Sequence, residues 1–152
     1  MLIMEEYENP KFDESIEERY PLKLWMLFEV QAINEKVANE AMKKHIESLG
    51  KEEGVFIKKY LIEDAEKLDA PENIKKKGIS HVFSVVAEVV VHINELSNAF
   101  KVIMNYAPSS IEVIAPEKYE LSLQDLQESL NSIADFMHKI LSYGLGGVVL
   151  KV

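Results

Sequence analysis

The 152-residue sequence predicts an α+β fold, in which helices pack on a mixed or antiparallel sheet. Two observations lead to this prediction. The stretch from Ile79 to Ile93 is rich in valine and alternates along much of its length, which is typical of a long strand. The stretches 34–50 and 123–143 instead carry apolar residues at helical spacing.

Residues 1–20 are acidic, with seven Asp or Glu against Lys11 and Arg19, and Pro10 and Pro21 punctuate the segment. Apolar residues are scattered among the acids, which indicates that the segment lies against something. We predict that residues 1–20 form an acidic N-terminal arm and that residues 21–152 form a single α+β domain.

The first predicted strand is Leu22–Ala32, which alternates apolar residues on one face. Trp25 and Leu27 make the other face apolar as well, so we expect a central strand that is covered on both sides. Asn34 is suited to cap the helix that follows, and Gly50 is suited to end it.

Val55–Ile62 is the second predicted strand, and Lys58 and Lys59 in its middle suggest a sheet edge. The polar stretch 63–78 is expected to hold a short helix. The strand 79–93 would span about 50 Å if it were straight, so we expect a bend or bulge near Ala87 and Glu88.

A helix is predicted over 94–107, followed by a strand over 110–115 that ends at Pro116. The last helix is predicted over 123–143, and a short strand over 148–152. We expect the last helix to turn one apolar stripe inward: Leu126, Leu130, Ile133, Met137, Ile140 and Leu141.

The resulting order is β-α-β-β-α-β, followed by a helix and a strand. The economical arrangement of this order is a ferredoxin-like sandwich with an added C-terminal helix and short strand.

The composition of the chain argues against several classes of function. The net charge of −9 argues against nucleic-acid binding, which depends on neutralising phosphates. No apolar run reaches the ~20 residues that a membrane helix needs, and cysteine is absent, so we expect a cytoplasmic protein that does not bind membranes. The scarcity of cysteine and glutamine and the heavy use of Lys and Glu are typical of thermophilic proteins.

Histidines are the candidate catalytic residues. His45 lies within the apolar stripe of the first long helix, where an imidazole could bind a ligand or transfer a proton. His81 is the second candidate. It is eleven positions from His92, so in a regular strand the two face opposite sides and cannot share a metal.

Asp135 and His138 have the carboxylate-x-x-His spacing of metal sites in helical bundles, and they are the one candidate metal pair. We predict no cofactor. Trp25, His45 and Tyr106 are candidate residues for a ligand pocket or an interface, because aromatic side chains are enriched at interfaces.

The segment from Val89 to Tyr143 contains a strand, a helix with Glu95-Leu96, and the run Met104-Asn-Tyr-Ala-Pro-Ser-Ser-Ile-Glu-Val-Ile-Ala-Pro116. It resembles the C-terminal extension of WYL-type bacterial transcription regulators. The resemblance implies a ferredoxin-like arrangement, oligomerisation and response to a ligand, and it implies no particular functional residue.

From these observations we expect a non-enzymatic homo-oligomeric module that binds a small ligand or a protein partner. A protein partner would dock on residues 1–20 or on an exposed strand edge. Two alternatives remain: a small hydrolase or isomerase that uses a histidine–carboxylate pair, and a subunit of a larger protein complex.

Overall fold

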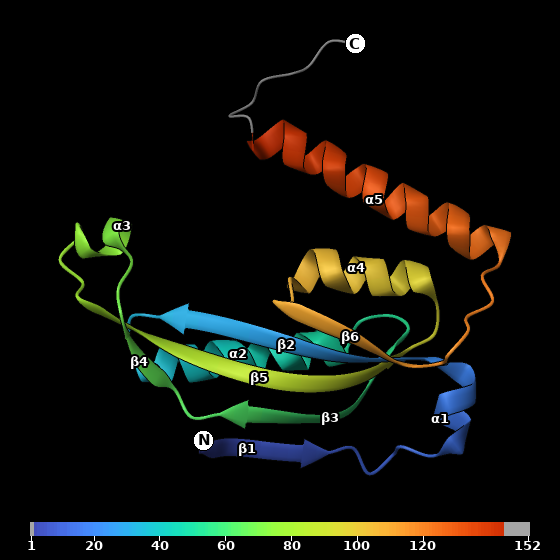
Figure 1. Ribbon diagram of the computed structural model, residues 1–152, viewed down its shortest axis with the longest axis horizontal. Helices are drawn as coiled ribbons and strands as arrows, with labels where there is room; N and C mark the ends of the chain where they lie inside the picture. The colour runs from blue at the N-terminus through green and yellow to red at the C-terminus, as the bar shows by residue number, and fades with distance from the viewer. Residues whose placement is uncertain (1, 145–152) are drawn as a thin grey trace.

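A computed structural model describes residues 2–144, and Figure 1 shows their arrangement as a sheet with helices above and behind it. In chain order the elements are β1 (Ile3–Glu8), α1 (Glu14–Arg19), β2 (Leu22–Ala32), α2 (Glu35–Gly50), β3 (Val55–Glu63), β4 (Glu66–Asp69), α3 (Glu72–Lys75), β5 (His81–Ile93), α4 (Leu96–Tyr106), β6 (Ser110–Ala115) and α5 (Leu123–Gly144).

The strands form one antiparallel sheet in the order β1-β3-β5-β2-β6, and β4 pairs with the first part of β5. The centre is the pair β2–β5, whose register runs without a break from Leu22 opposite Ile93 to Ala32 opposite Phe83. The bulge that we expected in β5 is therefore absent. A register shift occurs on the neighbouring strand β3, between Ile57 and Lys59.

The chain is α+β, but the predicted simple ferredoxin-like sandwich is wrong. The sheet has six strands instead of four, and the described residues form five helices. Two of the extra elements, β1 and α1, come from the segment predicted as an arm, where Glu5, Glu6 and Glu8 interrupt the apolar pattern from which a strand would have been predicted. The predicted strand 148–152 lies outside the described residues.

The prediction that Val55–Ile62 is an edge strand is also wrong, because β1 covers the edge of β3. Lys59 lies opposite Glu8 of β1, so the acidic strand offsets its charge. Lys58 falls at the register shift and places its Nζ 4.4 Å from the centre of the Phe12 ring. Both lysines that suggested an edge are explained by contacts with residues 1–20.

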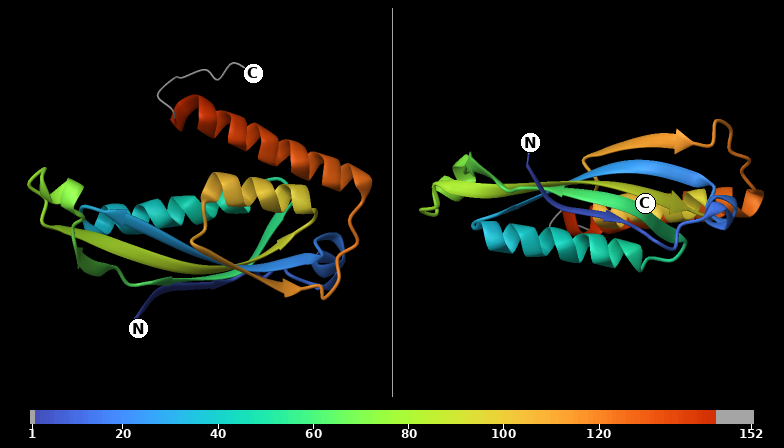
Figure 2. Two further views of the ribbon diagram at one scale, coloured as in Figure 1. Left: turned by 45° about the horizontal axis from the view of Figure 1, so that its top comes forward. Right: turned by 90° about the horizontal axis from the view of Figure 1, so that it is seen from below.

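Helix α2 covers one face of the sheet and contacts β2, β3 and β5 (Figure 2). Asn34 caps it by accepting a hydrogen bond from the Val37 N–H at 2.8 Å. Its buried side chains lie at i, i+4, i+8 and i+11, which is one helix face: Ala38, Met42, Ile46 and Leu49.

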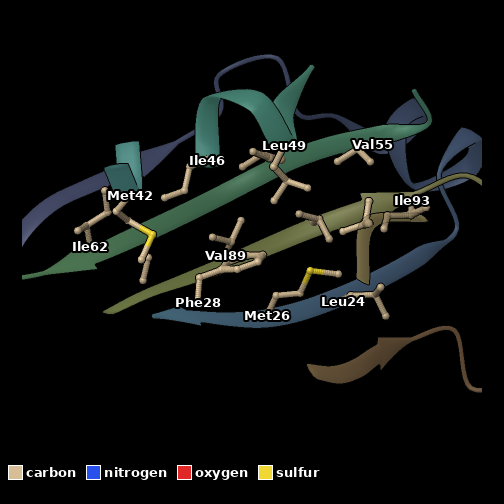
Figure 3. Close-up of a cluster of buried hydrophobic side chains, with 14 of the residues drawn as sticks. Leu24, Met26, Phe28, Met42, Ile46, Leu49, Val55, Ile62, Val89 and Ile93 are labelled. Carbon is tan, nitrogen blue, oxygen red and sulfur yellow. The ribbon is translucent and has the colours of Figure 1, made fainter. Parts of the chain in front are cut away.

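The core lies between α2 and the sheet. Figure 3 shows side chains of β2, β3 and β5 meeting those of α2, among them Met26, Met42 and Val89, which are fully buried. The turn that leads from α2 into β3 needs glycine at position 54, because φ is +75° there and a Cβ would lie 2.2 Å from Oδ1 of Asn94.

Among residues 2–144, only one end of the opposite face of the sheet is covered. There Phe12 and Tyr20, on either side of α1, pack against Phe56, and Phe12 also packs against His92. Further along β2 the side chain of Trp25 is half-buried, so the expectation that both faces of this strand are covered is wrong for its middle.

Candidate functional site

The apolar stripe of α5 gathers six exposed apolar side chains on one helix. Its members are between 39 % and 56 % exposed: Leu126, Leu130, Ile133, Met137, Ile140 and Leu141. We call these six residues the α5 stripe. The expectation that they point inward is wrong, because α5 contacts α4 and stands away from the sheet (Figures 1 and 2).

A different and more polar face of α5 attaches it to α4. Asp125 and Ser129 are buried there, and Ser132 and Phe136 continue the same face at helical spacing, half-buried. Because Asp125, two serines and Phe136 occupy this contact, the leucines and isoleucines of α5 lie to one side of it and remain accessible.

Asp125 fixes the start of α5 against the start of α4. Its carboxylate accepts hydrogen bonds from the backbone N–H groups of Leu96 at 2.9 Å and Ser97 at 2.8 Å, and from the hydroxyl of Tyr119 at 2.9 Å. Glu95 occupies the capping position of α4 but makes no side-chain cap, so Asp125 satisfies these N–H groups from another helix.

The same contacts control the protonation of Asp125. Burial favours the neutral form, but the hydrogen bonds from Ser97, Leu96 and Tyr119 favour the carboxylate more strongly, and the pKa of Asp125 is lowered as a result. The positive end of α4 is therefore matched by a charged group of α5.

The edge strand β6 adds further exposed apolar side chains. Val113 lies opposite the buried Leu24 of β2 and therefore on the helix-bearing face, yet it is 63 % exposed. Ile111, on the same face, is also exposed. The outer edge of β6 has no partner strand among residues 2–144.

The structure brings two members of the predicted Trp25, His45 and Tyr106 set together. His45 Nε2 lies 3.0 Å from the backbone carbonyl of Tyr106 and must donate to it, because a carbonyl only accepts. The imidazole packs edge-on between the rings of Phe28 and Tyr106. Trp25 lies on the opposite face of the sheet.

Tyr106 has its own polar partner. Its hydroxyl donates a hydrogen bond of 2.7 Å to Glu52, just after α2. Burial, and next the contact with Glu52, raise the pKa of Tyr106 to about 12. Together with His45 this contact ties the end of α4 to α2.

The remaining predicted residues are spread out. His81 is exposed at the start of β5, with Nδ1 3.6 Å from Oδ1 of Asp69 on β4. His92 is buried at the other end of β5, 2 % exposed, with Nδ1 3.3 Å from the Tyr20 carbonyl, and burial lowers its pKa. Asp135 and His138 are exposed on α5. Among the described residues no three His, Cys, Asp or Glu side chains gather into a potential metal site.

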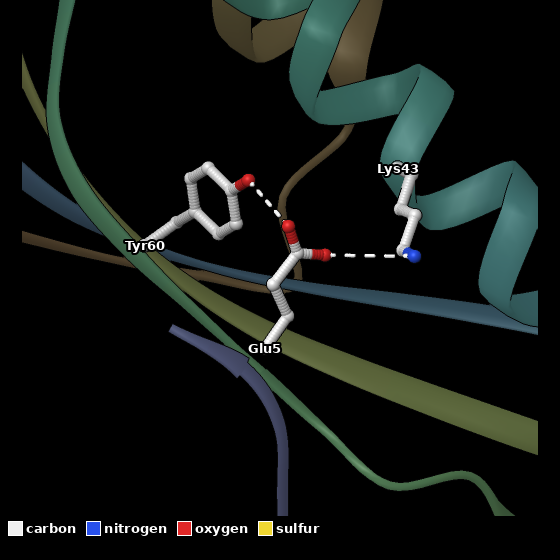
Figure 4. Close-up of polar contacts among 3 residues, drawn as sticks. All are labelled: Glu5, Lys43 and Tyr60. Carbon is white, nitrogen blue, oxygen red and sulfur yellow. Dashed lines mark hydrogen bonds and ion pairs between the residues drawn. The ribbon is translucent and has the colours of Figure 1, made fainter. Parts of the chain in front are cut away.

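A polar cluster that the sequence did not indicate lies at the edge of the sheet (Figure 4). Tyr60 donates a hydrogen bond of 3.1 Å to Glu5, and Glu5 lies 3.7 Å from Nζ of Lys43 on α2. Burial, and then the charge of Glu5, raise the pKa of Tyr60 to about 12. These residues line a crevice of about 440 Å³ between β1, β3 and α2. Without the pairing of β1 with β3, no sequence signal joins Glu5 to Tyr60.

The fold and the exposed stripe define a small α+β protein that exposes an apolar face on one helix. A family model described as the MJ0538 family matches residues 23–151, and the chain belongs to that family. No curated protein and no solved structure matches the chain. Within residues 2–144, no helix is long and apolar enough to cross a membrane.

Proposed function

We propose that the protein is a non-enzymatic homo-oligomeric module that assembles through the α5 stripe. The single observation that supports this proposal is the exposure of six large apolar side chains on one face of a helix whose main contact within the described residues is with α4. A contiguous apolar surface of this kind is typical of a protein–protein interface.

Length and charge favour a second copy as the partner. From Leu126 to Leu141 the stripe extends about 22 Å, enough for two helices to pack side by side. Two chains that each carry a charge of −9 repel, but α5 holds few charges: Glu128, Asp135 and Lys139 are exposed, and Asp125 is buried against α4. The apolar face is also self-complementary, as a two-fold symmetric contact requires.

The environment of His45 supports a non-enzymatic role. Its Nε2 is engaged with a backbone carbonyl and its ring is enclosed by two aromatic rings, so it holds α2 and α4 together. The oligomerisation and ligand response implied by the WYL resemblance agree with this proposal.

The test is the mass of the native full-length chain over a dilution series, by native mass spectrometry and analytical ultracentrifugation. We expect a dimer or larger assembly that Leu130→Glu converts to monomer, because a charge in the stripe would be buried at the interface. Gln124→Glu adds the same charge on the opposite side of α5 from the α5 stripe and should leave the mass unchanged. A monomeric wild-type chain, or an intact assembly of the Leu130→Glu variant, would refute the proposal.

A further inference from the structure

The face of the sheet that no long helix covers contains a hollow of about 380 Å³. Trp25, Leu61, Val90 and Ile114 supply its apolar lining, and its polar lining includes Glu6, Glu8, Lys59 and Glu88. A concave surface of this size with an apolar base and a few charged groups has the character of a small-molecule site.

Strand register places two carboxylates on either side of an apolar residue. Glu6 of β1 lies opposite Leu61 of β3, and Leu61 in turn lies opposite Glu88 of β5. Residues that are directly opposite in a sheet point to the same face. Since β3 separates the other two strands, the backbones of Glu6 and Glu88 are about 10 Å apart.

One of these carboxylates is held in place by the aromatic ring. Trp25 Nε1 donates a hydrogen bond of 3.1 Å to Oε1 of Glu88, and both side chains are half-buried. This contact fixes the carboxylate beside the indole ring and leaves Oε2 of Glu88 free of that bond. The indole can therefore offer its face, and Glu88 its second oxygen, to the same cationic group.

The charges in the hollow do not cancel. Glu8 lies opposite Lys59, and these two offset one another across β1 and β3. Glu6 and Glu88 then remain as two negative groups with hydrocarbon between them. A ligand that matches this surface has a positive group at each end and a hydrocarbon chain in the middle.

We propose that this hollow, which we call the Trp25 hollow, binds a linear aliphatic diamine or polyamine. One ammonium group pairs with Glu88 beside the indole ring of Trp25, the methylene chain lies over Leu61, and the second ammonium group pairs with Glu6. The proposal is independent of assembly through α5, because the α5 stripe lies on another element and takes no part in the hollow.

The chain contains a single tryptophan, so tryptophan fluorescence reports this hollow alone. We would titrate the full-length protein with 1,5-diaminopentane and with spermidine, and follow both Trp25 emission and heat by isothermal titration calorimetry. We expect saturable binding of one ligand per chain, a shift of the emission, and affinity that falls as salt is added.

Three comparison ligands separate the contribution of charge from that of the hydrocarbon chain. Pentylamine has one charge and the same chain, and it should bind at least about tenfold more weakly. Pentanol has the chain without a charge, and magnesium chloride has the charge without a chain, so neither should compete at the same concentrations. Competition by magnesium as strong as that of the diamine would overturn the proposal in favour of simple counterion binding.

Matched variants locate the site. Glu88→Gln keeps an oxygen that can accept from Trp25 but removes the charge, and it should weaken diamine binding at least about tenfold. Glu6→Gln should weaken diamine binding and leave pentylamine binding nearly unchanged, because it removes only the second contact. Glu120→Gln makes the same change at an exposed position outside the hollow and should have no effect.

Circular dichroism and the native mass of each variant show whether it is folded and assembled. The proposal is overturned if folded wild-type protein gives neither heat nor an emission change with the diamine, or if Glu120→Gln weakens binding as much as Glu88→Gln. A diamine that binds a monomeric chain would support the hollow and refute the assembly, so the two proposals fail separately.

Discussion

Helices α2 and α5 have the same kind of amphipathic sequence but end in opposite environments. The apolar side chains of α2, such as Met42 and Leu49, are completely buried between the helix and the sheet. The corresponding stripe of α5 is exposed, with Leu130 at 56 % and Met137 at 49 %. The apolar spacing of a helix therefore indicates that one face will be covered. It does not indicate whether the covering surface belongs to the same chain or to another molecule.

The two helices also differ in what attaches them to the rest of the chain. Apolar burial holds α2, whereas the attachment of α5 to α4 is centred on Asp125 and the hydrogen bonds that it accepts. Stability should accordingly depend on the apolar face of α2 and on the polar face of α5, and the following experiments test that difference.

The largest effect is expected for truncation of the α2 face. Leu49→Ala should lower the free energy of unfolding by about 2–5 kcal/mol, because it removes a fully buried side chain and leaves a cavity. Leu130→Ala should cost far less in denaturant unfolding at low protein concentration, where an assembly would dissociate. Equal losses for both variants would show that the α5 stripe is packed within its own chain.

Removal of the Asp125 charge should have the next largest effect. Asp125→Asn should lower stability at neutral pH by about 1–3 kcal/mol, because buried N–H groups of α4 lose their charged acceptor. The exposed Asp135 provides the control, and Asp135→Asn should be nearly neutral.

At acidic pH, the difference in stability between the Asp125→Asn variant and the wild type should disappear. The folded-state pKa of Asp125 is lowered, so its stabilisation is present above the unfolded pKa of about 3.9 and is lost as the pH falls through the folded value. Thermal unfolding of both proteins from neutral to acidic pH measures this convergence. A constant difference down to low pH would contradict the assigned role of the carboxylate.

A smaller effect is expected where α4 is tied to the end of α2. Tyr106→Phe removes the hydrogen bond to Glu52 and should cost about 0.5–1.5 kcal/mol. The pKa of Tyr106 is raised from 10.0 to about 12, so its contribution is complete below pH 10 and is lost as the pH rises towards 12. Phenolate absorbance during an alkaline titration reports this ionisation. A difference titration, wild type minus Tyr106→Phe, whose midpoint lies near pH 10 would contradict the shift.

The smallest change in stability is expected for a substitution on the polar face of α2. Lys43 pairs with Glu5 at 3.7 Å, but both side chains are more than a third exposed. Lys43→Met should therefore change stability by less than about 1 kcal/mol. A loss as large as that of Leu49→Ala would mean that this ion pair, and not apolar burial, anchors α2 to the sheet edge.

Much of the local structure was predictable. The Asn34 cap, the helix that ends at Gly50, the alternation of β2 and the apolar run of β5 all depend on neighbours within a few residues, and these predictions hold. The edge strand β1 was not predictable, because its acidic residues are satisfied by distant partners: Glu5 by Tyr60 and Lys43, and Glu8 by Lys59.

The candidate sites likewise have features that the sequence could predict and features that it could not. Sequence alone singled out Trp25, His45 and Tyr106 as residue types suited to a site, but it could not place Trp25 on one face of the sheet and the other two at the contact between α2 and α4 on the opposite face. It also could not join Glu6 to Glu88, which are far apart in the chain and meet across Leu61 through the pairing of β1, β3 and β5.

The α+β class, the positions of most strands and helices, and the presence of an apolar stripe on α5 could be predicted from the sequence, because side-chain periodicity and capping are local properties. The strand order, the burial of α2 and the exposure of α5 depend on the tertiary fold. Those outcomes follow from which surfaces pack together across long sequence separations: the face of α5 that contacts α4 carries Asp125, which accepts two backbone hydrogen bonds from α4, while the α5 stripe remains exposed.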